Sequence, residues 1–102
     1  MLETLARTSL VDDRRFAEVR ATSLVARGAG DHRVRHELAR AGVAAELIDE
    51  AVALLPPESE RATRIVERRG AGPKTARYLA GKGFSEDVIN AVIAQSLHEP
   101  LG

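Results

Sequence analysis

Apolar residues recur at every third or fourth position along most of the chain, which is the spacing of amphipathic helices. No stretch alternates apolar and polar residues in the way that a half-buried strand does. Glycines or prolines separate most of the helical stretches from one another. The pattern predicts an all-α fold with helices over residues 2–10, 12–26, 31–41, 44–55, 57–69, 73–82 and 85–97.

The tetrapeptide Arg-Gly-Ala-Gly occurs twice, at residues 27–30 and 69–72. Each copy is followed by a basic segment, then by a single glycine, Gly42 or Gly83, and then by an acidic and apolar segment. The copies are separated by 42 residues at the tetrapeptides and by 41 residues at the later glycines. A period of this size is typical of a two- or three-helix unit in a repeat protein.

The repeat divides the chain into two three-helix units, at residues 11–56 and 57–102, with Pro56-Pro57 at the boundary. A unit of this size is too small to bury much core alone, so such units normally stack on a neighbour. Residues 1–10 carry one further helix. This helix is either the last helix of a truncated first repeat or an N-terminal cap helix.

Local signals give the helix ends and the expected core. Asp12, Asp31 and Ser85 are predicted as N-cap residues, because their side-chain oxygens can accept a hydrogen bond from the first turn. Pro73 suits the first position of a helix, where its missing N–H costs nothing. The expected core consists of apolar positions on the inner helix faces, among them Phe16, Val19, Leu24, Val34, Leu38, Ala41, Leu47, Ile48, Ile65, Val66, Leu79, Ile89, Val92 and Leu97.

Composition narrows the class of protein. Hydrophobic residues make up 44% of the chain but aromatic residues only 3%, so Ala, Val, Leu and Ile must build a core of closely packed helices. The absence of cysteine excludes disulfides and a thiolate zinc site. No run approaches the ~20 apolar residues of a membrane span, and the N-terminus lacks the pattern of a signal peptide. We therefore expect a cytoplasmic protein without a membrane partner.

Charge is divided between the helices although the net charge is +0. Residues 61–82 contain seven basic side chains against Glu67 alone, whereas residues 41–60 and 83–102 contain no Lys or Arg. One interpretation is that these are solvated helix faces, some of them paired across the units. The other interpretation is a basic strip that faces a long acidic partner, such as a protein filament groove or a phosphate backbone.

No set of residues in the sequence suggests a catalytic or metal site. His32 and His36 are four residues apart on one predicted helix, but no third ligand accompanies them. The Gly-x-Gly turns precede helices without following a strand, so they lack the context of a phosphate-binding loop. The acidic helices after Gly42 and Gly83 would repel DNA phosphates, which argues against a helix-turn-helix reader. We predict a non-enzymatic protein without cofactor, metal or small-molecule substrate.

Three separated motifs resemble the RecX family, regulators of the bacterial recombinase RecA. Residues 10–17, Leu-Val-Asp-Asp-Arg-Arg-Phe-Ala, are similar to the family's "lDDerFA" segment. Two further family motifs are matched by Arg27-Gly28-Ala29-Gly30, Arg33, Arg35, Glu37-Leu38, Gly42-Val43 and Ile48, and by Arg77-Tyr78-Leu79, Gly83-Phe84-Ser85 and Ile89. The resemblance covers about residues 2–97. Ala29 and Ala71 stand where the family has an aromatic residue.

The resemblance implies three tandem three-helix repeats in an elongated, curved, solenoid-like molecule, of which residues 1–10 would be the last helix of the first repeat. It also implies a regulator of recombination and DNA repair that binds the groove of the RecA filament on single-stranded DNA, bridges its protomers, and inhibits its ATPase and strand-exchange activity. A weak direct contact with DNA is compatible with this function. The residues expected to contact the filament or phosphate are Arg14, Arg15, Arg27, Arg33, Arg35, Arg40, Lys74 and Arg77.

The residues themselves leave two alternatives open. The first is a helical module that binds nucleic acid directly, for which binding should weaken steeply as salt rises. The second is a non-catalytic scaffold for protein interaction or dimerisation, built on the apolar surface of residues 2–10.

Overall fold

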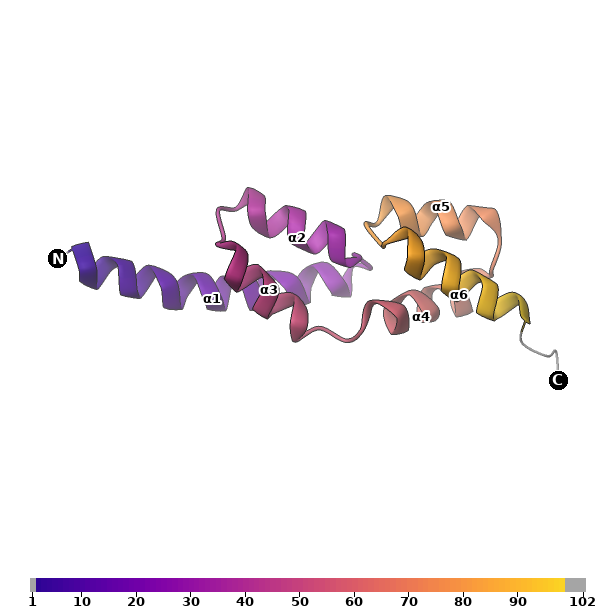
Figure 1. Ribbon diagram of the computed structural model, residues 1–102, viewed down its shortest axis with the longest axis horizontal. Helices are drawn as coiled ribbons and strands as arrows, with labels where there is room; N and C mark the ends of the chain where they lie inside the picture. The colour runs from indigo at the N-terminus through magenta and orange to yellow at the C-terminus, as the bar shows by residue number, and fades with distance from the viewer. Residues whose placement is uncertain (1, 99–102) are drawn as a thin grey trace.

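The computed structural model describes the backbone of residues 2–98 and the side chains of residues 12–97. Within that part of the chain every regular element is a helix and no strand occurs. The helices are α1 (Leu2–Ala26), α2 (Asp31–Arg40), α3 (Ala45–Ala53), α4 (Glu58–Arg69), α5 (Pro73–Gly81) and α6 (Glu86–His98) (Figure 1). The predicted all-α fold is confirmed.

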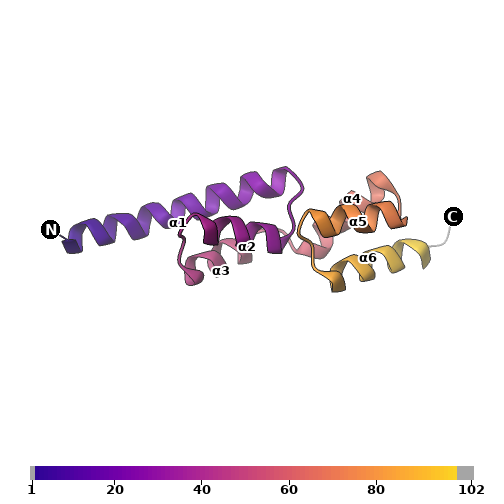
Figure 2. The same ribbon diagram turned by 90° about the horizontal axis from the view of Figure 1, so that it is seen from above.

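The molecule is built from two three-helix units that lie end to end (Figures 1 and 2). The first unit contains α1–α3 and the second contains α4–α6, and together they measure 64 × 22 × 19 Å. Each unit has its own hydrophobic core, with Leu38 fully buried in the first and Leu79 fully buried in the second. Because the two cores are separate, the units must be connected by contacts of another kind.

The two units follow the same path because glycines turn the chain at the same places. Gly28 and Gly70 follow the first helix of each unit with φ of +90° and +91°, and Gly42 and Gly83 follow the second helix with φ of +87° and +93°. Residues with a side chain rarely adopt these values. The repeat in the sequence is therefore also a repeat in three dimensions.

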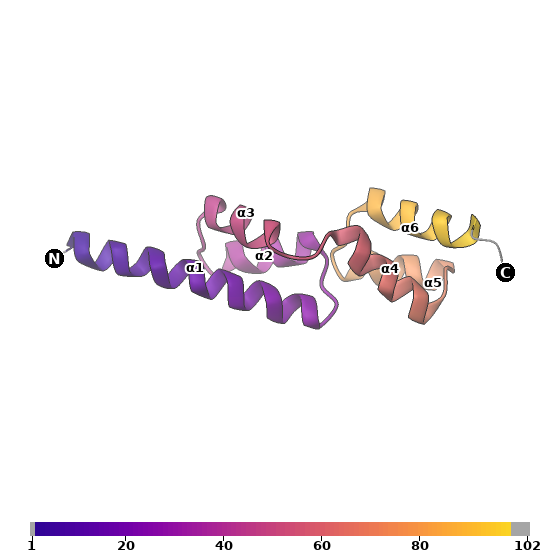
Figure 3. The same cartoon turned by 90° about the horizontal axis from the view of Figure 1, so that it is seen from below.

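The first helix, α1, is continuous over 25 residues, so the predicted break between residues 10 and 12 is wrong. Asp12 lies inside α1 and does not begin a helix. An N-cap signal alone does not interrupt a helix when no Gly or Pro accompanies it, because Asp costs less than ~1 kcal/mol in a helix interior. The N-terminal part of α1 extends beyond α2 and α3 (Figure 3). The assignment of residues 1–10 to a preceding repeat stays a prediction.

Phe16 and Val19 are 44% and 64% exposed, although the apolar pattern predicted them to be buried. α1 packs within its unit along the stripe of Ala17, Ala21 and Leu24, which are at most 7% exposed. A helix in a three-helix unit is covered on one side only, so the neighbouring stripe lies at the surface. The prediction failed because α1 carries apolar residues on the stripe that its neighbours cover and also on the stripe that faces solvent.

Smaller differences concern the helix ends. Ala41 and Leu97, both predicted to be buried, are exposed because they lie at the ends of α2 and α6, where neighbouring helices no longer cover them. Gly30, rather than Asp31, is the N-cap residue of α2, without a side-chain cap bond. The predicted Ser85 cap is confirmed, because its Oγ accepts a hydrogen bond from the backbone N–H of residue 88 at 3.3 Å.

The units meet where the first tetrapeptide lies against the Gly83–Phe84 turn, a contact termed the joint. The Gly30 N–H donates to the Lys82 carbonyl at 2.9 Å, and the His32 N–H donates to the Gly83 carbonyl at 2.9 Å. A Cβ atom at Gly30 would lie 2.4 Å from the backbone nitrogen of Phe84. Glycine is therefore required at this position so that the two backbones can approach.

Replacing Gly30 by alanine should destabilise the protein, whereas the same change at Gly72 should not. Both glycines precede a helix with φ of −85° and −93°, which alanine adopts without strain. A Cβ atom at Gly72 would meet no atom within 4 Å. We expect Gly30→Ala to lower the free energy of urea unfolding by about 2 kcal/mol, an overpacking penalty. Gly72→Ala should change it by less than ~0.5 kcal/mol. Equal effects would contradict the role of the joint.

Candidate partner-binding site

A buried arginine crosses the joint. Arg61 of α4 is 8% exposed, and its guanidinium reaches the first unit. Its Nε donates to the Pro56 carbonyl at 3.0 Å, its Nη1 donates to the Ala29 carbonyl at 2.8 Å, and its Nη2 pairs with the Asp31 carboxylate. The guanidinium carbon also lies 6.0 Å from the centre of the Phe84 ring. The buried charge is stable here because all three nitrogens are hydrogen-bonded.

Glu58 makes a second polar connection across the joint. One carboxylate oxygen accepts a hydrogen bond from the Asp31 N–H at 2.8 Å, and the other accepts one from the Ser85 hydroxyl at 3.1 Å. Asp31, Glu58, Arg61 and Ser85 are termed the joint network. No buried side-chain polar atom among residues 12–97 lacks a hydrogen-bond partner. The units therefore meet with their polar groups satisfied.

Beside the joint lies a pocket of about 190 Å³ lined by residues from both units. Its cationic side chains are Arg20 from α1, Arg27 from the turn that follows α1, Arg33 from α2, and Lys82, which directly follows α5. These four side chains are termed the basic pocket, and Glu37 is the carboxylate among its lining residues. Arginine binds carboxylate or phosphate through two parallel hydrogen bonds. The pocket is therefore suited to an anionic group of a partner.

Contacts within the protein fix two of these arginines. Arg20 pairs with Glu37, with 3.6 Å between nitrogen and oxygen, and so connects α1 with α2. Arg33 donates from Nη2 to the Gly81 carbonyl at 2.9 Å and so connects α2 with α5. Because the second contact spans the two units, the geometry of the basic pocket depends on the joint.

An aromatic side chain extends the cationic surface beyond the pocket. The Arg69 guanidinium carbon lies 3.8 Å from the centre of the Tyr78 ring, and the Lys82 ammonium nitrogen lies 5.9 Å from it. Cation–π contacts of this kind orient long side chains without neutralising their charge. The basic surface therefore continues from Lys82 across Tyr78 to Arg69.

Of the residues predicted to contact a partner, the structure brings Arg27 and Arg33 together in the basic pocket. Arg20 and Lys82, which complete it, were not among the predicted contact residues. Arg20 lies about two helical turns before Arg27, which directly follows α1, and this signal was available in the sequence. Lys82 had no such signal, because only the joint places it beside α1.

Arg14 and Arg35 are paired with acidic residues of α3. The distance between nitrogen and oxygen is 3.5 Å from Arg14 to Glu50 and 2.6 Å from Arg35 to Asp49. The four side chains are at least 46% exposed, so these pairs contribute little to stability. Both pairs lie within the first unit, and the predicted pairing across the units is made instead by Arg61 with Asp31.

The other four predicted contact residues lie outside the pocket. They are exposed to solvent: Arg15, Arg40, Lys74 and Arg77. Arg15 lines an open hollow of about 480 Å³ on α1, beside Phe16 and Val19. Of the eight predicted residues, two therefore lie in the basic pocket, and the other six are spread over the rest of the surface.

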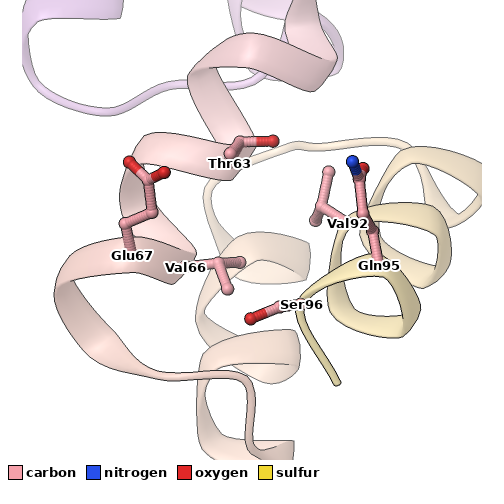
Figure 4. A pocket seen from close by; sticks show the side chains of 6 residues that line it. All are labelled: Thr63, Val66, Glu67, Val92, Gln95 and Ser96. Atoms are coloured by element: carbon pink, nitrogen blue, oxygen red, sulfur yellow. The ribbon is translucent and has the colours of Figure 1, made fainter. Parts of the chain in front are cut away.

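A smaller cavity lies between α4 and α6 (Figure 4). Its volume is about 40 Å³, and it is lined by Thr63, Val66, Glu67, Val92, Gln95 and Ser96. A space of this size can contain a water molecule but no organic substrate. Its lining contains one carboxylate, that of Glu67, and a single carboxylate does not form a catalytic site.

The described residues contain neither a candidate metal site nor a helix that could span a membrane. In that part of the chain no group of three or more His, Cys, Asp or Glu side chains could bind a metal ion. His32 and His36 are both exposed on α2. Over the same residues, no helix has the length and apolar character needed to cross a membrane.

The fold and the joint define the class: a protein of tandem three-helix units packed end to end. A family model described as "RecX, second three-helix domain" matches residues 12–52, which is most of the first unit. The chain is 36% identical over 104 residues to "Regulatory protein RecX" of Halorhodospira halophila, covering 92% of this chain and 65% of that protein. It is 33% identical over 103 residues to the RecX protein of Trichlorobacter lovleyi, covering 86% and 67% of the two chains.

The chain belongs to the RecX family. It also matches the RecX protein of Chromohalobacter salexigens, at 31% identity over 94% of this chain and 69% of that protein. The chain therefore spans about two thirds of the length of these curated relatives. No solved structure matches it significantly. The family expected from the three sequence motifs is confirmed.

Replacing Arg61 by methionine should destabilise the joint. The change keeps an unbranched side chain but leaves the Asp31 carboxylate without its partner. Breaking a buried pair costs roughly 3–5 kcal/mol, and we expect about 3 kcal/mol in urea unfolding because the Asp31 side chain is 31% exposed. The matched control is Arg64→Met, one turn along α4 and exposed, for which less than ~0.5 kcal/mol is expected. Identical unfolding curves for the two variants would refute a stabilising joint network.

Proposed function

We propose that this chain is a RecX-type regulator that binds along the groove of the RecA filament on single-stranded DNA and lowers its ATPase and strand-exchange activity. Its membership of a family of regulatory proteins supports the proposal, as does the resemblance of its motifs to RecA regulators. The observation that carries the proposal is the basic pocket, which collects four cations at the joint of a chain with a net charge of +0.

The elongated shape suits a partner that is itself a repeating assembly. The molecule is 64 Å long but only 22 and 19 Å in its other dimensions, and the joint sets the spacing of its two similar units. A tandem repeat protein can present equivalent elements to equivalent surfaces on neighbouring protomers. Bridging of this kind opposes the movements of protomers during ATP turnover, so inhibition follows from binding.

The charge distribution favours an acidic protein surface over bare DNA as the main partner. Binding to a phosphate backbone needs several cations that neutralise phosphates along a strand. In this chain Arg14 and Arg35 are already paired with acidic residues of α3. Arg27, Arg33 and Lys82 line one compact pocket, and a pocket of this kind fits a short acidic segment better than a long strand.

One observation supports the second candidate, a module that binds nucleic acid directly. The stack of Arg69 on Tyr78, with Lys82 close by, places cations beside an aromatic ring. Sites for single-stranded nucleic acid combine these two features, since bases stack on the ring while cations neutralise phosphates. A weak contact with the DNA inside the filament is compatible with both candidates.

Reversing two charges of the basic pocket should weaken binding to RecA filaments. The double variant Arg27→Glu/Lys82→Glu removes two pocket cations and leaves the joint network intact. In cosedimentation with filaments assembled on single-stranded DNA, we expect binding to weaken about 100-fold, because close charge pairs across an interface contribute roughly 1.5 kcal/mol or more each.

The matched control is Arg14→Glu/Arg40→Glu, which makes the same change in net charge at exposed positions outside the pocket. It should weaken binding less than ~5-fold, as expected for charges at the rim of an interface. Circular dichroism should show equal helicity in both variants. Unchanged binding of the pocket variant would contradict the assignment. Affinity for a labelled oligonucleotide that falls steeply with salt, without filament binding, would favour the second candidate.

A further inference from the structure

The basic pocket continues into the apolar hollow on α1. The hollow is lined by Asp12, Arg15, Phe16, Val19, Arg20 and Ser23. Arg20 lines both the hollow and the basic pocket. The two spaces therefore form one continuous surface, termed the α1 groove.

One side of the groove follows α1 and the turn after it. Phe16 and Arg20 are four residues apart on one face of α1, and Arg27 is the first residue after this helix. At a rise of 1.5 Å per residue, Phe16 and Arg27 are about 16 Å apart along the helix axis. That distance corresponds to about five residues of an extended peptide or to about three turns of a helix.

The apolar end of the groove is unusual for the surface of this protein. Four large hydrophobic side chains are exposed among the described residues, Phe16, Val19, Leu54 and Leu97. Two of them, Phe16 and Val19, are neighbours in the hollow. Apolar side chains that are exposed singly need no explanation, and Phe16 and Val19 differ from Leu54 and Leu97 because they are neighbours in a space that charged side chains also line.

The charges around the groove select the chemistry of the partner. Arg27, Arg33 and Lys82 lie at the pocket end, where carboxylates are favoured. Asp12 and Arg15 both line the hollow end, so their opposite charges offset each other there. A phosphate backbone is charged along its whole length, so it would meet the apolar pair unfavourably. A segment that changes from apolar to acidic matches the groove along its length.

We infer that the α1 groove binds a segment of a protein partner in which two apolar side chains stand next to a run of carboxylates. The apolar side chains cover Phe16 and Val19, and the carboxylates pair with Arg27, Arg33 and Lys82. The salt bridge of Arg20 with Glu37 lies at the boundary between the two halves. The inference rests on the proposed function, because it names the chemistry that this site recognises on the filament.

A synthetic peptide tests the inference with the whole chain. The probe is fluorescently labelled, amidated Leu-Ala-Leu-Glu-Asp-Glu-Glu, used together with the reversed sequence because either direction could fit. We expect one of the two to bind, as measured by fluorescence anisotropy. Replacing both leucines by serine, or all four acids by their amides, should weaken binding at least about 10-fold, since each half supplies part of the contact.

Variants of the protein locate the peptide. Phe16→Ser/Val19→Ser alters side chains outside the core, so the fold should be retained, and peptide binding should weaken about 10-fold. Leu54→Ser is the matched control, because Leu54 is 72% exposed and lies outside the groove. Its affinity for the peptide should equal that of the unchanged chain.

Three results of the binding experiments would overturn the inference. They are failure of both peptides to bind, equal affinity of the Phe16→Ser/Val19→Ser variant, and tighter binding of oligothymidylate with the same dependence on Phe16. A concentration-dependent dimer that disappears in the same variant would assign the groove to a second copy and overturn it as well. If the chain binds filaments but neither peptide, the inference is overturned and the proposed function is not. Peptide binding without filament binding would support the ligand class and overturn the proposed function.

Discussion

The close approach of two turns at the joint is the contact on which the rest of the structure depends. Each unit encloses its own small core, so the units are connected through backbone contacts and the network around Arg61. A Cβ atom at Gly83 would lie 2.6 Å from the Cβ of Arg33, which shows how little space separates the units. Small residues set the distance between the units, and a buried arginine with satisfied hydrogen bonds sets their orientation.

The candidate site exists because the joint exists. Arg20, Arg27 and Arg33 come from the first unit, and Lys82 comes from the second. Without the joint, Lys82 would not lie beside the end of α1. The chain as a whole is neutral, so its basic pocket arises from the arrangement of the units rather than from an excess of charge. This arrangement also brings the pocket next to an apolar hollow, which gives the surface two chemically different halves.

The fold was largely predictable from the sequence because its signals are local: helical spacing, glycine turns and a repeated tetrapeptide. The continuity of α1 could not be predicted, because an Asp at position 12 is compatible with a helix interior as well as with an N-cap. The exposure of Phe16 was missed because an apolar pattern does not show which helix stripe a neighbour covers. In the site, the burial of Arg61 and the position of Lys82 depend on contacts between distant parts of the chain. A run of basic residues looks the same in the sequence whether its members are buried or exposed.

The rate of ATP hydrolysis by RecA on single-stranded DNA, measured as this chain is added, tests the role of the joint most directly. If the joint builds the surface that regulates the filament, the unchanged chain and Gly72→Ala should lower the rate equally, and Gly30→Ala should lose most of the inhibition. A rate that does not respond to the unchanged chain would contradict the account, and so would equal inhibition by Gly30→Ala.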